Sequence, residues 1–122
     1  MGTLTPGDVV TLWFPFSHSE DAPFKKRPVL VLSSVGAKGT RDETVLVAMI
    51  TSSAARVAAP ASFDIIVDGW EHSGLRAPSV VRANRIWTAE NRDVASSLGR
   101  ISAPTLHSVK ERLAQLLGMT LA

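Results

Sequence analysis

The apolar positions of this chain fall into short runs, and the most continuous of these runs directly follows a cluster of cations. The stretch KKRPVLVLSS at 25–34 sets two lysines, an arginine and a proline before four aliphatic residues. Such a run, partly β-branched and closed by serines, is typical of a strand that is buried on both faces. Pro28 restricts the residue before it to extended conformations, so we expect Arg27 to be held rigidly at the mouth of this strand.

The other apolar runs predict four more strands, at 9–14, 43–50, 63–67 and 78–88. The segments between them are polar or contain Gly, Pro and small residues, which predicts loops and connections at 15–26, 35–42 and 54–61. A helix is predicted after Ser102, a suitable N-cap, because apolar residues then recur every three or four positions as far as Gly118. Five or more strands followed by one helix predict a mainly β fold: a small β-barrel with a C-terminal helix packed on it.

The last predicted strand carries polar side chains that could contact a nucleic acid. Alternation places Arg82 and Asn84 on one face, flanked by Val80 and Ile86, with Arg85 on the other. An arginine beside an amide can bind phosphates and base edges. On this strand alone, a solvated face that keeps the protein soluble is the commoner explanation.

Three further features have two interpretations each. Thr51 and Ser52 end a buried strand, where hydroxyls either cap backbone groups or bind a ligand, and capping is the commoner role. His18 lies in a long polar loop near two carboxylates, so it is either a general base or a bystander. The aromatic residues of the first and last strands and the first loop either stack on bases or, more commonly, pack in the core (Trp13, Phe16 and Trp87).

Composition narrows the possible chemistry. The 122 residues suit one domain over 1–122, and a formal net charge of +2 is weak evidence for nucleic acid. The absence of cysteine excludes disulfides and thiolate metal sites, and no metal-binding or phosphate-loop motif is present, so we expect no metal and no cofactor. If this protein cleaves phosphodiester bonds without a metal ion, the nucleophile is the substrate's own 2′-hydroxyl, which restricts the substrate to RNA. No signal peptide or membrane-spanning run is visible, and a cytoplasmic protein is expected.

Five segments along the chain are individually weak but characteristic as an ordered set: GDVV at 7–10, KRPVLVL at 26–32, MITS at 49–52, GLRAPSVVR leading into RIWT at 74–88, and LGRIS at 98–102. Together they span nearly the whole chain and resemble the MazF/PemK (Kid) family of toxins from bacterial toxin–antitoxin pairs. The resemblance implies an SH3-like β-barrel that acts as a homodimer. It also implies metal-independent, sequence-specific cleavage of single-stranded RNA, chiefly mRNA, that leaves a 2′,3′-cyclic phosphate and a 5′-hydroxyl.

The resemblance further implies roles for single residues. The catalytic arginine and threonine of the family fall on Arg27 and Thr51, and a histidine of the first loop matches His18 approximately. Some members use an arginine and an aspartate that match Arg82 and Asn84. Because an amide takes up no proton at neutral pH, Asn84 is expected only to bind RNA. The predicted catalytic residues are thus Arg27, Thr51, Arg82 and His18, and the predicted RNA-binding residues are Ser52, Asn84, Lys26 and Arg85.

Two other functions are compatible with the same fold. The gyrase poison CcdB has the same barrel, so a gyrase-binding growth inhibitor is one alternative, and an RNA-binding barrel with weak catalysis is another. The expected partners are single-stranded RNA and a cognate antitoxin, whose acidic flexible segment would lie in a groove containing Arg27 and Arg82.

Overall fold

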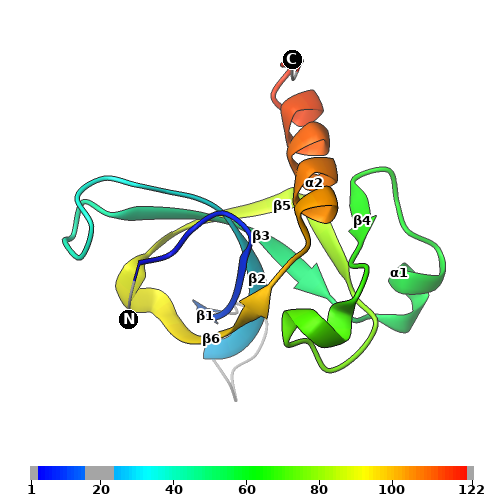
Figure 1. The fold of residues 1–122 in the computed structure, drawn as a ribbon, viewed down its shortest axis with the longest axis horizontal. Coiled ribbons are helices and arrows are strands. Elements are labelled where there is room, and N and C mark those ends of the chain that lie inside the picture. Colours follow the sequence, from blue (N-terminus) through cyan, green and yellow to red (C-terminus); the bar gives the residue numbers. More distant parts are fainter. Residues whose placement is uncertain (1–2, 16–23, 121–122) are drawn as a thin grey trace.

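The computed structural model describes residues 3–15 and 24–120, which form one six-stranded antiparallel sheet with a helix against it (Figure 1). The strands are β1 (Asp8–Pro15), β2 (Phe24–Val35), β3 (Thr44–Thr51), β4 (Asp64–Ile66), β5 (Val80–Glu90) and β6 (Val94–Arg100). The helices are α1 (Ala54–Ala58), α2 (Ala103–Leu116) and the short 3₁₀ turns η1 (Trp70–Ser73) and η2 (Asn91–Asp93). The predicted fold class, mainly β with a C-terminal helix, is confirmed.

The strands follow the order β4-β5-β3-β2-β1-β6. Figure 1 shows that the sheet curls, with α2 standing beside β5 and β4. The edge strands of the described sheet are β4 and β6, so the sheet is barrel-like but open. No helix among the described residues is long and apolar enough to cross a membrane.

The prediction that β2 is buried on both faces is confirmed. Its aliphatic residues alternate between two core clusters: Leu30 and Leu32 belong to one, Val29 and Val31 to the other, and all four are at most 5% exposed. The first cluster includes Val109 of α2, and the second includes residues of β1 and β3. β2 is therefore the central strand around which both halves of the core form.

Several element boundaries differ from the prediction. β2 begins at Phe24, so Lys26 lies in a strand paired with Trp13 of β1 and not in the predicted loop. The segment at 94–100 was not predicted, yet it forms β6; its serines and half-exposed positions suit an edge strand but weaken the sequence signal. The helix α1, in the segment predicted as a connection, is only five residues long and buries none of them.

The largest departure is a bulge in β5. Ala48 of β3 pairs with Ile86, whereas its neighbour Met49 pairs with Arg82, so residues 83–85 bulge from the ladder. Paired residues share a face, and Ala48 and Met49 pack into opposite core clusters. The predicted alternation is therefore wrong: Arg82 and Ile86 lie on opposite faces, because the bulge interrupts the two-residue period.

The hairpin between β2 and β3 depends on a buried carboxylate, which generates a prediction. The Glu43 side chain is 1% exposed and accepts hydrogen bonds from the Gly39 N–H (3.1 Å) and the Ser34 hydroxyl (2.9 Å), with Lys38 Nζ 3.7 Å away. The bond from the Gly39 N–H, then that from Ser34, lowers the pKa of Glu43 below its usual value of 4.5. The ionised form therefore stabilises the fold fully above the unfolded-state pKa, and this stabilisation is lost as the pH falls through the folded-state pKa.

We expect Glu43→Gln to be less stable than the wild type at pH 6, with the difference shrinking at pH 3. Urea unfolding at both pH values measures this. Glu71→Gln, in the exposed part of η1, is the matched control, and its free energy of unfolding should change with pH as the wild type's does. If the stability of Glu43→Gln changes with pH as the wild type's does, the stabilising role of ionised Glu43 is contradicted.

Candidate active site

A cleft opens where β2 and β3 separate. Their pairing ends at Val29 and Met49; beyond this point β2 pairs with β1 and β3 pairs with β5. Pro28 lies where β2 has only β1 as a neighbour, so its missing N–H does not interrupt the β2–β3 ladder. The gap forms a cleft of about 660 Å³ whose lining includes Arg27 from one strand and Thr51 from the other.

The third wall is the segment between η1 and β5. Its residues at 74–77 line the cleft together with Ser96 and Leu98 of β6, against which they pack. Gly74 has φ +81°, and a Cβ there would lie 2.1 Å from the Leu98 carbonyl oxygen, so only glycine permits this approach. The close packing of these two segments holds Arg76 at the cleft.

The described lining is cationic and rich in hydroxyls. Lys26, Arg27 and Arg76 supply positive charge. The Thr51 hydroxyl accepts a hydrogen bond from the Ser53 N–H (3.2 Å), so it caps the strand end as expected, but it keeps a proton to donate. No carboxylate or imidazole lines the cleft among the residues that the structure describes. Such a site suits an anion.

The remaining hydroxyls form part of the cleft wall. Thr11 and Ser96 are joined by a 2.6 Å hydrogen bond between their oxygens, which links β1 and β6. Ser79 donates to the Ala77 carbonyl at 2.8 Å and so fixes the start of β5. Ser52 and Ser53 follow Thr51 in the lining. The structure thus brings together four of the predicted site residues: Arg27, Thr51, Ser52 and Lys26.

Arg82 is not among the lining residues. Its Nε lies 3.8 Å from Asp64 Oδ1, and Asp64, with a side chain only 1% exposed, also accepts hydrogen bonds from Arg56 Nη1 and the Ala61 N–H, both at 2.9 Å. Burial first, and then repulsion by Arg56 and Arg85, lowers the pKa of Arg82, against the attraction of Asp64. The structure therefore pairs Arg82 with β4 and does not place it beside Arg27 as a second clamp.

The other predicted residues also lie apart from the cleft lining. Asn84 and Arg85 are exposed in the β5 bulge. His18 and Phe16 are outside the described residues, so the role of His18 stays a prediction. The residues that the structure describes contain no group of three or more His, Asp and Glu side chains that could hold a metal ion.

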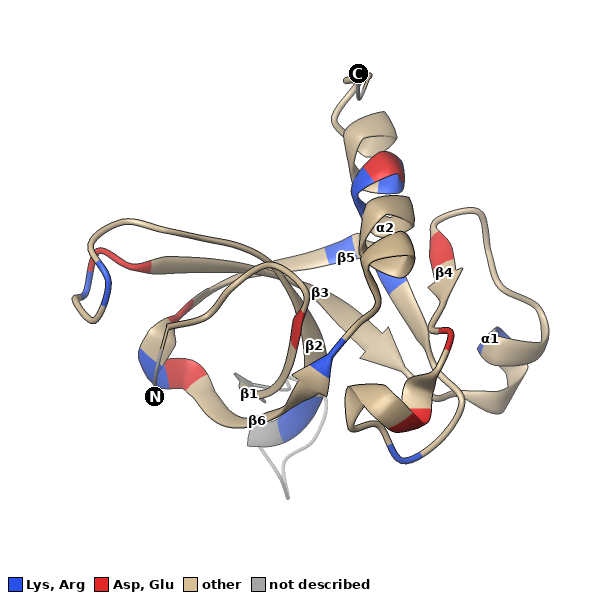
Figure 2. Ribbon diagram, in the orientation of Figure 1, with Lys and Arg blue, Asp and Glu red and all other residues tan. Residues whose placement is uncertain are grey.

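Arg76 is the cleft residue that the site prediction missed. The sequence contained a signal for it, because Arg76 stands inside the GLRAPSVVR segment used for the resemblance. A loop residue has no periodicity that assigns it to a face, so the strand pattern favours Arg82 instead. Figure 2 shows separate cationic positions at the start of β2 and in the loop before β5, and the cleft lining contains residues of both.

Comparison with known proteins gives concordant results. Residues 5–117 match the model of the PemK-like, MazF-like toxins of type II toxin–antitoxin systems. The chain is 32% identical over 101 residues to the endoribonuclease MazF2 of Mycobacterium bovis, which covers 83% of this chain and 86% of that protein. It also resembles the crystal structure of MazF from Deinococcus radiodurans (TM-score 0.74, 26% identity, 98% and 100% coverage). A MazE–MazF structure from the same organism matches similarly (TM-score 0.72, 26% identity, 98% and 100% coverage).

The contacts of Arg56 and Arg82 with Asp64 predict that the Asp64 carboxylate stabilises the fold. Asp64→Ala removes a charge-assisted hydrogen bond from Arg56 and leaves Arg82 without its carboxylate, so we expect a loss of about 2–3 kcal/mol in the free energy of unfolding. Chemical denaturation measures the loss. Asp68→Ala, in the turn after β4, is the control and should change stability by less than about 0.5 kcal/mol. Equal effects of the two substitutions would contradict the structural role.

Proposed function

This chain belongs to the PemK-like, MazF-like family of toxins of type II toxin–antitoxin systems, and we propose that it is a metal-independent endoribonuclease that cuts single-stranded RNA. The proposal rests mainly on one observation: Arg27 of β2 and Thr51 of β3 meet in a single cationic cleft. These are the two positions at which the family resemblance expects catalytic residues. The relatives named as endoribonucleases support the same activity.

In the proposed reaction the 2′-hydroxyl of the RNA attacks the adjacent phosphorus. The bond to the 5′-oxygen of the next nucleotide breaks, which leaves a 2′,3′-cyclic phosphate and a 5′-hydroxyl end. Negative charge builds on the phosphoryl oxygens in the transition state. Arg27 stabilises that charge more strongly than it binds the ground state, which makes the contact catalytic. Thr51 and Ser52 donate hydrogen bonds that orient the phosphate.

Arg76 takes the role of second cation in this proposal. It lines the same cleft as Arg27, whereas Arg82 is paired with buried Asp64. A guanidinium suits the phosphate because its planar donors match two oxygens at once. Lys26, one residue from Arg27, attracts the RNA backbone as a point charge.

The cleft's charge also suits an acidic partner. The similar Deinococcus radiodurans structure is a MazE–MazF complex. We propose that the cognate antitoxin of this chain lays an acidic segment along the same cleft and blocks RNA entry, since both ligands are polyanions. We further propose that the toxin acts as a homodimer on mRNA in the cytoplasm, as the family resemblance implies.

The proposed activity predicts cleavage of single-stranded RNA in EDTA. Primer extension on a long RNA should map discrete cut sites, and the upstream fragments should carry 2′,3′-cyclic phosphates. Arg27→Ala should lower kcat/KM by roughly 10–100-fold, because a charge-assisted contact contributes ~1.5–3 kcal/mol. Cleavage that survives a 2′-O-methyl group at the mapped site would sink the mechanism.

Arg76 yields a separate prediction. We expect Arg76→Ala to lower kcat by a factor similar to that of Arg27→Ala, roughly 10–100-fold. Arg112→Ala removes an exposed arginine from α2 and is the matched charge control, with little effect expected. Single-turnover kinetics on one mapped RNA measures all three variants. An Arg76→Ala protein that is as active as the Arg112→Ala protein would remove Arg76 from the site.

A further inference from the structure

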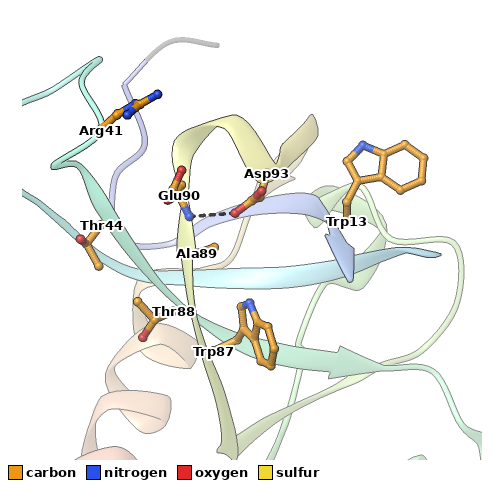
Figure 3. Close-up of a pocket in the computed structure, with 8 residues that line it drawn as sticks. All are labelled: Trp13, Arg41, Thr44, Trp87, Thr88, Ala89, Glu90 and Asp93. Atoms are coloured by element: carbon orange, nitrogen blue, oxygen red, sulfur yellow. Dashed lines mark hydrogen bonds between the residues drawn. The ribbon is translucent and has the colours of Figure 1, made fainter. Parts of the chain in front are cut away.

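A second, more open pocket lies outside the cleft and has a different chemistry. Its volume is about 520 Å³, and it shares no lining residue with the cleft. Figure 3 shows the indoles of Trp13 (β1) and Trp87 (β5) apart from each other, with Arg41 of the β2–β3 hairpin on the opposite side from Trp13. The lining residues are Trp13, Arg41, Thr44, Trp87, Thr88, Ala89, Glu90 and Asp93.

The two tryptophans of this pocket are unusually exposed. Trp13 is 46% and Trp87 44% exposed, although both stand in strands of the sheet. The third tryptophan, Trp70, packs against the core instead. Core packing, the commoner expectation for Trp13 and Trp87 from the sequence, is therefore wrong for both. Tryptophan, with a large apolar ring and a polar N–H, is enriched at interaction surfaces.

Lys26 connects this pocket to the cleft. It lines the cleft beside Arg27, and its Nζ lies 5.5 Å from the centre of the Trp13 ring, a cation–π distance. Trp13 and Lys26 are also register partners of β1 and β2. A polyanion bound at Arg27 that continues past Lys26 therefore meets the Trp13 indole next.

The chemistry of the remaining lining favours a nucleic acid over an apolar protein surface. Apart from the indoles and Ala89, the side chains are polar or charged, unlike the core of a stable protein–protein interface. The two carboxylates keep their charge, but that of Glu90 is balanced by Arg92, whose Nε lies 2.5 Å from Glu90 Oε2, and Asp93 Oδ2 accepts a hydrogen bond from the Glu90 N–H at 3.0 Å. Arg41 adds a cation at the opposite side (Figure 3).

We propose that Trp13 and Trp87 form a base-stacking platform for single-stranded RNA, and that Lys26 guides the backbone to it from the cleft. This inference rests on the proposed endoribonuclease function and names a second part of its substrate path. Indole faces stack on any base, so the platform contributes affinity for RNA with little sequence preference of its own. Bases flanking the scissile phosphate are thereby held while the cleft acts on the phosphate.

The tryptophan content permits a direct test. The chain has three tryptophans and no tyrosine, so its intrinsic fluorescence reports on these residues. We expect a short mixed-sequence 2′-O-methyl RNA, which cannot be cut, to quench the emission as bases stack on the exposed indoles. Trp13→Leu and Trp87→Leu should each remove part of the quench and weaken binding roughly five- to a hundredfold. Trp87→Phe keeps an aromatic face and should retain most of the affinity.

Two controls keep the test decisive. Leu117→Ala removes an exposed apolar residue beyond α2 and should leave both quench and affinity unchanged. Circular dichroism and thermal unfolding verify that the leucine variants are folded; where one is not, the corresponding phenylalanine variant and the wild-type quench provide the readout. Wild-type RNA binding without quenching, or leucine variants with wild-type affinity, would overturn the platform.

The outcomes for the platform and for the enzyme are separable. If only the platform proposal is wrong, the wild type cuts RNA, but RNA binding does not quench its tryptophan fluorescence. Failure of the enzyme alone would give quenching and binding without cleavage of unmodified RNA. On a cut RNA, the leucine variants should raise KM and leave kcat nearly unchanged. Variants that alter the sedimentation coefficient or antitoxin binding, but not RNA affinity, would assign the surface to a protein partner and reject the proposal.

Discussion

The site depends on the point at which two paired strands separate. Up to Val29 and Met49, β2 and β3 share one ladder and bury both faces of β2. Beyond that pair each strand keeps only its outer neighbour, and the sheet divides into β6-β1-β2 and β3-β5-β4. Backbone groups released from a ladder must find other partners or face water. The cleft lies in the gap between the separated strands, where a charged ligand can reach the side chains that line it.

The buried carboxylate of Asp64 holds Arg82 outside the cleft lining, whereas Arg76 lines the cleft. Asp64 binds Arg56 and the Ala61 N–H, and it lies close to Arg82, which ties α1 and β5 to the edge strand β4. Asn84 and Arg85 lie within the bulge at 83–85, where they are exposed and outside the cleft lining. Arg76 reaches the cleft because Gly74 lets its loop pack against β6. The loop thus brings Arg76 to the cleft, whereas the strand holds Arg82 beside Asp64.

The sequence predicted what depends on local pattern and missed what depends on pairing between distant segments. The core of β2, the end of β3 and the N-cap of α2 all have clear periodic or capping signals, and the structure contains them, although Leu116, the last apolar residue of the predicted helical stripe, is exposed. The β5 bulge has no such signal, because its register is set by β3, some forty residues earlier in the chain. Nor does any local pattern show that Asp64 lies beside Arg82, or that the loop carrying Arg76 packs against β6. Residue types could therefore be predicted, but their assignment to one site could not.

The energetics of the proposed reaction indicate which group limits its rate. Two charge-assisted contacts that strengthen in the transition state supply roughly 3–6 kcal/mol, or about 10²–10⁴-fold. A positioned proton acceptor would add ~10²–10⁴-fold more, which is as large as the whole contribution of the arginines. The described lining of the cleft has no such acceptor, and Asn84, whose amide takes up no proton, lies elsewhere. In the proposed reaction the arginines stabilise the phosphate, and the proton acceptor, for which His18 is the candidate from the sequence, sets how fast the reaction runs.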